Sequence, residues 1–309
     1  DDFTVTFHET QADATSGANA LSSPYSNTTA NQQTIFVRVL NDDTGCFNDD
    51  FTFDIIVNPL PDFTVTTPQI VCLNGPPLTI VAENPAAVYD IVWTDPSGNT
   101  IIGSQITITS GGLYSVTATT TDGTSCGRTR TIQVNESIIA TITENDVTIV
   151  DDSDNNSITI DPTNLGVGDY EYALRNEDAV TTPYQDSPVF ENLPGGFYTI
   201  LVQDKNGCGI AELEVSVVEF PKFFTPNNDG IKDTWEIKGA NSTLFPGSLI
   251  SIFNRFGKIV AKIDIDGPGW DGTFNGKTLP SDDYWFSIEL VDRNGVMRNR
   301  KGNFSLLRK

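Results

Sequence analysis

The chain has 309 residues, 38% of them hydrophobic, and a formal net charge of −23 at pH 7. That length predicts about two to four domains. The acidic excess repels nucleic-acid phosphates and excludes a nucleic-acid partner, and no apolar run reaches the ~20 residues that a membrane-spanning helix needs.

The charge is divided unevenly along the chain. Residues 1–219 contain 5 Lys and Arg against 31 Asp and Glu, a net charge of −26, whereas residues 220–309 contain 13 against 10, a net charge of +3. The only methionine is Met297, and no signal peptide is visible at the start of the sequence. We therefore expect the chain to begin inside a longer precursor.

Apolar and polar residues alternate with a period of two along most of the chain, which is typical of strands with one buried face. Thr34–Leu40 and Phe51–Val57 are two such strands. Asp169–Arg175 has the composition of a helix, but its large residues alternate, so we predict a strand there. With Gly, Pro and Asn turns and no 3.6-residue stripe, the pattern predicts an all-β chain of tandem immunoglobulin-like sandwiches.

A strand, a polar turn with a cysteine and a second strand recur three times, with Cys46, Cys126 and Cys208 in the turns. Each hairpin is expected to close one sandwich. The first module has few strands before its hairpin, so we expect its opening strands to be missing. The paired prolines of Asn58–Pro61 end that module, because proline cannot continue a strand ladder. The predicted division is a partial immunoglobulin-like module at 1–58, an immunoglobulin-like module at 59–136, a third sandwich at 137–219 and a C-terminal sandwich at 220–309.

The four cysteines lack the Cys-x-x-Cys spacing of zinc and redox sites, and their wide distribution favours disulfides in an oxidising, extracellular setting. Cys72, Trp93 and Cys126 follow the order in which an immunoglobulin domain bridges its two sheets around a buried tryptophan. This order predicts a Cys72–Cys126 disulfide, with two buried free thiols as the alternative. Cys46 and Cys208 have no partner in their own modules, and we expect the partner of Cys46 upstream of Asp1.

Residues 220–309 predict a separate compact sandwich. Leu249–Phe253 and Ile259–Ile263 flank a turn whose glycine suits a tight hairpin with a bulge. Asp283–Leu290 alternates as a strand, Thr234–Ile237 is typical of a short strand, and Arg293–Gly295 carries a type I′ turn signal.

No residue pattern points to catalysis. His8 is the only histidine, and no Gly-x-Ser-x-Gly elbow accompanies it, so a Ser-His-Asp triad has no basis. Asn227, Asp229 and Asp233 have the oxygen-rich spacing of a calcium loop, but Lys232 interrupts it, and a solvated turn is the simpler interpretation. We expect no enzymatic activity, no cofactor and no metal, with structural calcium as the open alternative.

Thr4–Ala14 and Val57–Pro61 are similar to an immunoglobulin-like repeat of large Bacteroidota surface proteins. Leu193–Tyr198 and Asp204–Cys208 resemble a second repeat, found in SprB-like gliding adhesins. Together the two resemblances cover most of residues 1–219 and imply the stalk of a surface adhesin.

A more specific set of motifs lies in the last ninety or so residues. Its members are Phe224, Thr225, Pro226, Asn227, Asp229, Gly230, Trp235, Arg255, Gly257, Trp270, Asp271, Tyr284 and Arg308. In order and spacing they resemble the type B C-terminal sorting domain of the type IX secretion system, also called the gliding-motility-associated C-terminal domain. The sequence departs from that pattern with Asn228 where glycine is usual, Lys232 where asparagine is usual and Phe256 where tryptophan is usual.

The resemblance implies passage through the type IX translocon, attachment at the outer membrane and an outer-membrane β-barrel partner of the SprF type. One docking candidate is the unpaired edge around Phe220–Pro226, because an edge strand can extend a partner's sheet. For Phe223, Phe224 and Trp235 a place in the core is the favoured alternative. The other docking candidate is a basic tail of Arg298, Arg300, Lys301, Arg308 and Lys309.

The favoured function is the C-terminal part of a cell-surface adhesin, for gliding motility or attachment, with an unknown extracellular ligand. One alternative is a secreted enzyme whose catalytic domain lies upstream. The other is a carbohydrate-binding surface protein, which needs a planar row of exposed aromatic residues. We expect the first two modules largely to lack such a row.

Overall fold

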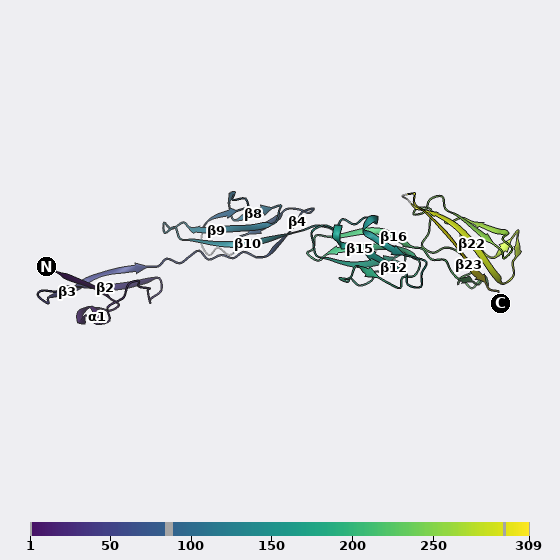
Figure 1. Ribbon diagram of the computed structural model, residues 1–309. Helices are drawn as coiled ribbons and strands as arrows, with labels where there is room; N and C mark the ends of the chain where they lie inside the picture. Colours follow the sequence, from purple (N-terminus) through teal and green to yellow (C-terminus); the bar gives the residue numbers. More distant parts are fainter. Residues whose placement is uncertain (1, 84–88, 293–294, 309) are drawn as a thin grey trace. The chain divides into compact units, whose positions relative to one another are not determined.

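Figure 1 shows the protein as a computed structural model, in which residues 2–83, 89–292 and 295–308 are described. Strands hold 48% of the residues and helix 4%, which confirms the predicted all-β class. The chain forms two compact units: one comprises Asp1–Gln69 and Leu78–Asn135, the other Ile70–Pro77 and Glu136–Lys309. Among the described residues, no helix has the length and apolar character of a bilayer-spanning segment.

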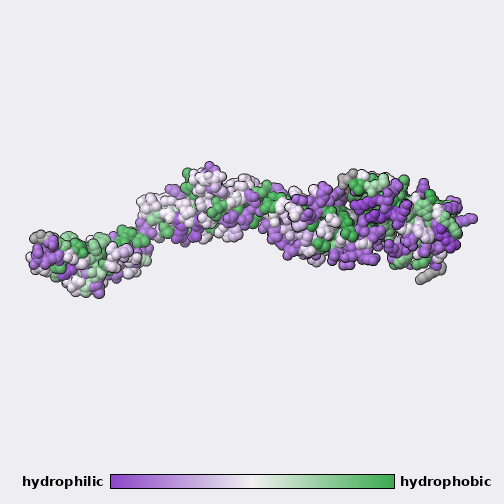
Figure 2. All heavy atoms as spheres, viewed as in Figure 1, coloured by the Kyte–Doolittle hydropathy of each residue, from purple (hydrophilic) through white to green (hydrophobic). Residues whose placement is uncertain are grey.

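The first unit begins with a three-stranded antiparallel sheet, in the order β1-β2-β3. Its strands are β1 (Phe3–His8), β2 (Gln32–Asn41) and β3 (Phe47–Ile56). The strand register places five large apolar side chains on one face, each at least 41% exposed: Phe3, Val5, Phe7, Phe51 and Phe53. Hydrophobic residues are visible in green on the surface of this part of the chain in Figure 2. The face is exposed because no second sheet of the described residues covers it.

A short helix, α1 (Gln11–Ser16), follows β1 and was not predicted. The Thr10 side chain caps its N-terminus by accepting a hydrogen bond from the Asp13 N–H, and Gly17 ends it with a φ of 74°. Because six residues make less than two turns, the sequence has no repeating apolar stripe to signal this helix.

The second sandwich combines a five-stranded sheet, in the order β4-β10-β9-β6-β7, with a β5-β8 pair. Trp93 on β6 is fully buried, as expected, and its Nε1–H donates to the Gly103 carbonyl at 2.9 Å. The strands are β4 (Gln69–Cys72), β5 (Leu78–Val81), β6 (Tyr89–Thr94), β7 (Thr100–Ile102), β8 (Gln105–Ile108), β9 (Gly112–Thr120) and β10 (Gly127–Ser137).

The third sandwich lies in the second unit and consists of two three-stranded sheets, β11-β12-β14 and β13-β15-β16, which share one core. β13 spans Tyr170–Asn176, so the strand predicted from the alternating residues is confirmed over the helix that composition allowed. The other elements are β11 (Val147–Val150), β12 (Ser157–Ile160), β14 (Val189–Phe190), β15 (Gly196–Asp204), β16 (Ile210–Val217) and the 3₁₀ turns η1 (Glu144–Asp146) and η2 (Pro162–Asn164).

The C-terminal sandwich belongs to the same unit and has a five-stranded sheet in the order β17-β23-β22-β18-β19, with a β20-β21 hairpin. The predicted bulged hairpin is confirmed between β18 and β19, where the register shifts at Phe253. Thr234–Ile237 is not a strand: it contributes only the single bridge between Trp235 and Trp270. Part of the predicted turn at 293–295 lies outside the described residues. The strands are β17 (Phe223–Phe224), β18 (Leu249–Phe253), β19 (Ile259–Ile263), β20 (Thr273–Phe274), β21 (Lys277–Thr278), β22 (Asp282–Val291) and β23 (Met297–Leu306).

The three cysteine-containing hairpins are confirmed as β2–β3, β9–β10 and β15–β16, but the predicted disulfide is wrong. Cys72 bonds to Cys208, with a Cα–Cα distance of 5.4 Å, and Cys46 and Cys126 are free. Cys126 directly precedes β10, whereas the Leu73 N–H donates to the carbonyl of Ser137, the last residue of β10. The first and last residues of β10 are about 35 Å apart, because the strand has eleven extended residues. Cys126 and Cys72 therefore lie near opposite ends of β10, whereas a disulfide needs Cα atoms within ~7 Å.

Candidate sorting and docking site

The beginning and the end of the C-terminal sandwich lie side by side at one edge of its sheet. β17 pairs in parallel with the end of β23, so that Phe223 is opposite Ser305 and Phe224 is opposite Leu306. The Leu307 N–H then donates to the Phe224 carbonyl at 3.0 Å. β17 is the edge strand of the sheet, as predicted for the segment around Phe220–Pro226.

Arg308 ties this edge to two neighbouring loops. Its guanidinium donates to the carbonyls of Leu279 at 2.9 Å and Gly272 at 3.1 Å, with longer contacts to the carbonyls of Asp271 at 3.4 Å and Pro226 at 3.5 Å. A Cβ on Gly272 would lie 2.8 Å from this guanidinium and 2.5 Å from Leu306, so the glycine permits the close approach. The structure therefore brings the predicted motif residues Pro226, Asp271 and Arg308 together.

The exposed loop from Asn227 to Asp233 is held by one carboxylate. The Asp233 side chain accepts hydrogen bonds from the backbone N–H groups of Asn227 at 2.9 Å, Asn228 at 2.6 Å and Gly230 at 2.7 Å. Burial raises the pKa of the Asp233 carboxyl, but these backbone hydrogen bonds outweigh it and hold the pKa below its usual value.

The two departures from the usual motif in this loop have a backbone explanation. Asn228 has a φ of 61° and Lys232 a φ of 54°, both in the left-handed region. Glycine reaches that region without strain and asparagine tolerates it, which accounts for the residues that are usual there. Lys232 adopts it with the ammonium 4.0 Å from the centre of the Phe223 ring.

The calcium candidates remain an untested expectation. Asn227 and Asp229 bond to each other through their side chains at 2.8 Å, and Asp233 already receives three backbone N–H groups. Within residues 2–83, 89–292 and 295–308, no cluster of three or more His, Cys, Asp or Glu side chains is arranged to hold a metal ion.

The aromatic motif residues Phe224, Trp235, Trp270 and Tyr284 are buried, with at most 5% of each exposed. They surround Phe304, whose ring lies 4.2 Å from that of Trp235 and stacks on it. The Trp235 Nε1–H donates to the Pro221 carbonyl at 2.8 Å. These four residues therefore build the core from which the exposed loops project. The expected core position is confirmed for Phe224 and Trp235 but is wrong for Phe223, which is 39% exposed because neighbouring residues of β17 face opposite sides of the sheet.

The β18–β19 turn presents the remaining motif residues. The Asn254 side chain accepts hydrogen bonds from the N–H groups of Phe256 and Lys258, both at 3.0 Å, and Gly257 closes the turn with a φ of 75°. This fixed backbone holds Phe256 81% exposed. Arg255 lies 5.1 Å from the centre of the Phe256 ring and 3.6 Å from the Asp282 carboxylate.

The residues of the predicted basic tail do not form one surface. Arg298 and Arg300 lie 3.5 and 3.8 Å from Asp151 of the third sandwich, whose side chain is 11% exposed. Burial raises the pKa of the Asp151 carboxyl, although both guanidinium groups act to lower it. Arg308 is bound to carbonyls, and Lys309 lies outside the described residues. The alternation of β23 explains this result, because Arg298 and Arg300 lie on the same face of the strand as the buried Phe304.

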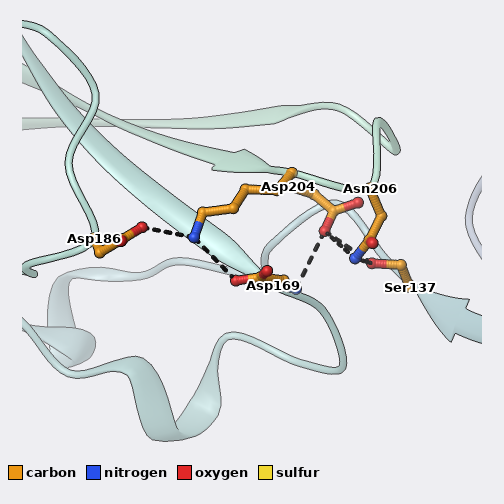
Figure 3. Close-up of polar contacts among 6 residues, drawn as sticks. Ser137, Asp169, Asp186, Asp204 and Asn206 are labelled. Atoms are coloured by element: carbon orange, nitrogen blue, oxygen red, sulfur yellow. Dashed lines mark hydrogen bonds and ion pairs between the residues drawn. The ribbon is translucent and has the colours of Figure 1, made fainter.

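Sequence reasoning missed a polar cluster beside the disulfide. The buried Asp204 carboxylate accepts hydrogen bonds from the Ser137 hydroxyl at 2.9 Å and the Asn206 amide at 3.1 Å (Figure 3). It also accepts one from the Cys208 N–H at 3.1 Å. The neighbouring Lys205 forms ion pairs with Asp169 and Asp186 at 3.2 and 2.6 Å. The Asp-Lys-Asn-Gly-Cys turn was visible in the sequence, but four cysteines allow three pairings and turn chemistry does not choose among them.

Two protein-family models match the chain, one at each end. Residues 218–306 match the model of the CHU_C type IX secretion signal domain. This match confirms the predicted resemblance of the C-terminal sandwich. Residues 1–61 match the Flavobacterium inter-domain disulphide bond domain. A type IX secretion signal implies export to the cell surface or the extracellular space and interaction with the secretion system.

The solved structures that align with the chain do so at low similarity. Immunoglobulin domains 1–5 of Sidekick-1 align over 100% of this chain and 74% of theirs, with 13% identity and a TM-score of 0.36. Two fibronectin type III domains of chicken tenascin align over 51% of this chain and 98% of theirs, with 15% identity and a TM-score of 0.25. Four tandem repeats of a large adhesion protein align over 99% and 91%, with 14% identity and a TM-score of 0.21. No curated protein matches the sequence.

Proposed function

We propose that the chain is the C-terminal part of a cell-surface adhesin exported by the type IX secretion system, with tandem sandwiches as the stalk and residues 220–309 as the sorting and docking module. The observation that carries this proposal is the assembly of the family motifs at one edge of the C-terminal sandwich. There Pro226, Asp271 and Arg308 meet beside the edge strand β17.

The charge distribution supports different roles for the modules before residue 220 and for the last domain. The modules before residue 220 carry −26, so they repel one another and stay soluble, whereas the last domain carries +3. The proposed partner is an outer-membrane β-barrel of the SprF type, which retains the protein at the outer membrane. Gliding motility or attachment is the proposed role, and catalysis is not part of it.

Two exposed elements of the C-terminal domain are available for docking. One is the edge strand β17 with the loop that Asp233 holds, and the other is the β18–β19 turn with Phe256 at its tip. Both have a backbone fixed by side-chain hydrogen bonds, so little conformational entropy is lost when a partner binds.

The test is export of a periplasm-targeted fluorescent reporter fused to residues 218–309, in a type IX-competent cell with and without the barrel. The fusion begins at Val218 because Val218 and Phe220 belong to the core of the domain. We expect surface-held reporter only when the barrel is present. Phe256→Ala should release the reporter into the medium, and Leu249→Ala, at a residue 71% exposed outside the motifs, is the matched control. Reporter trapped in the periplasm with the intact domain would contradict the proposal.

Carbohydrate binding is a second candidate function, because the β1-β2-β3 sheet exposes aromatic side chains. The rings of Phe7 and Phe53 meet edge to face, at 86°. A flat sugar-stacking platform needs coplanar rings, so this pair does not supply one. A glycan array with the intact chain distinguishes this candidate from an adhesin for another ligand.

A further inference from the structure

The Cys72–Cys208 disulfide joins two residues that are 136 positions apart in the sequence. Both lie in the second compact unit, which takes in Ile70–Pro77 and resumes at Glu136. Between the two cysteines lie β5 to β9 and all of β10, followed by every strand of the third sandwich except β16. The crosslink therefore closes a covalent loop around nearly two sandwich domains.

Hydrogen bonds hold the two sides of this crosslink together. The Leu73 N–H donates to the Ser137 carbonyl at 2.9 Å, and the Ile139 N–H donates to the Asn74 side chain at 3.2 Å. The Asp204 carboxylate accepts hydrogen bonds from both Ser137 and Cys208. The disulfide is therefore part of a fixed junction.

We propose that the Cys72–Cys208 bond is a mechanical crosslink that carries tension past residues 73–207. A force that separates residues before Cys72 from residues after Cys208 acts along the shortest covalent path, which runs through the two sulfur atoms. Residues 73–207 form a side loop of that path and transmit none of the force. The intervening strands are then protected from mechanical unfolding as long as the disulfide is intact.

The path beyond the crosslink is short. β16 (Ile210–Val217) leads from Cys208 directly to Val218 and Phe220, which belong to the core of the C-terminal domain. Tension from the first module therefore reaches that domain through β4 of the second sandwich and β16 of the third, and the strands between Cys72 and Cys208 lie outside this covalent path. This inference concerns any stretching of the chain and does not depend on the proposed export or docking function.

The size of the protected loop sets the expected effect. At about 3.3–3.6 Å per residue, 136 residue spacings extend to about 450–490 Å, and the oxidised crosslink replaces them with a Cα–Cα distance of 5.4 Å. Reduction should therefore lengthen the fully stretched chain by about 450–490 Å.

The test is single-molecule stretching of the intact chain between handles at its two ends, with and without a thiol reductant. The oxidised chain should extend through the first module, β4, β16 and the C-terminal domain, without releasing the length of residues 73–207. The reduced chain should reach a length about 450–490 Å greater. Cys72→Ser with Cys208→Ser should give the longer chain without reductant. The fully stretched length does not depend on how stably these variants fold, so a destabilised variant remains informative.

Cys46→Ser with Cys126→Ser is the matched control, since these two cysteines are free. It should keep the shorter length under oxidising conditions and gain the same length on reduction. Equal lengths for the oxidised and reduced wild-type chain would overturn the proposal, as would steps in the oxidised chain that release the length of residues 73–207.

Discussion

Replacing Phe304 with alanine should unfold the C-terminal domain far more easily than any substitution at its surface. Phe304 is 1% exposed, and its ring centre lies 4.2 Å from that of Trp235 and 6.0–6.3 Å from those of Phe224, Trp270 and Tyr284. A buried Phe→Ala substitution costs about 3–5 kcal/mol in all, and the loss of aromatic pairs worth roughly 0.5–1.5 kcal/mol each places Phe304→Ala in the upper part of that range. We therefore expect a loss of about 4–5 kcal/mol in the free energy of unfolding.

The assay is urea unfolding of residues 218–309, followed by tryptophan fluorescence. With a denaturant slope near 1 kcal/mol per molar urea for a domain of this size, the midpoint should fall by about 4 M or the domain should be unfolded in water. Phe256→Ala is the control, because Phe256 is 81% exposed and its removal should change stability by less than about 0.5 kcal/mol. A loss below about 1 kcal/mol for Phe304→Ala would refute the aromatic core as the source of stability.

Three further predictions concern other contacts of the same chain. Arg308→Ala removes a charged donor from four carbonyls and should lower the free energy of unfolding of the isolated domain in urea by about 2–3 kcal/mol. Arg308→Lys should recover less than half of this loss, because one ammonium cannot replace the planar guanidinium. An unchanged unfolding midpoint would contradict a stabilising role for the Arg308 hydrogen bonds. The folded state lowers the pKa of Asp233, so its carboxylate stabilises the loop at pH values above its ordinary pKa of 3.8, and this contribution is lost as the pH falls through the lowered pKa. The melting temperatures of wild type and Asp233→Asn should therefore differ at neutral pH and converge in acid. A difference that stays constant with pH would argue against this role. Peptide mapping without reduction should find the two free cysteines alkylated and a crosslinked Cys72–Cys208 peptide pair, whereas an alkylated Cys72 would contradict the assigned bond.

The elements that depend on local pattern were predictable from the sequence. Period-two alternation located β13 and the three cysteine-containing hairpins, and the glycine after Phe256 located the bulged β18–β19 turn. Several residues of the sorting motifs meet backbone requirements, such as the left-handed conformation at Gly230 and Gly257. Residues fixed by their own neighbours in the chain carry this information directly.

The features that depend on distant parts of the chain were not predictable. The Cys72–Cys208 pairing joins two predicted modules, and the Cys-Trp-Cys order within one module pointed to a different bond. Arg298 and Arg300 have the composition of an exposed tail, yet the strand register turns them toward Asp151. The apolar face of β1-β2-β3 alternates like a buried one, so only the structure shows that it is exposed.

The position of β23 in its sheet bears on when the C-terminal domain can form. β23 (Met297–Leu306) lies between β17 and β22, so it is an interior strand that comes last in the domain's sequence. A chain truncated before Met297 lacks the partner of both neighbours, as well as Phe304 from the centre of the core. The sheet and the aromatic core of the domain therefore stay incomplete until β23 is in place, so any product cut before Met297 exposes aromatic side chains that the intact domain buries.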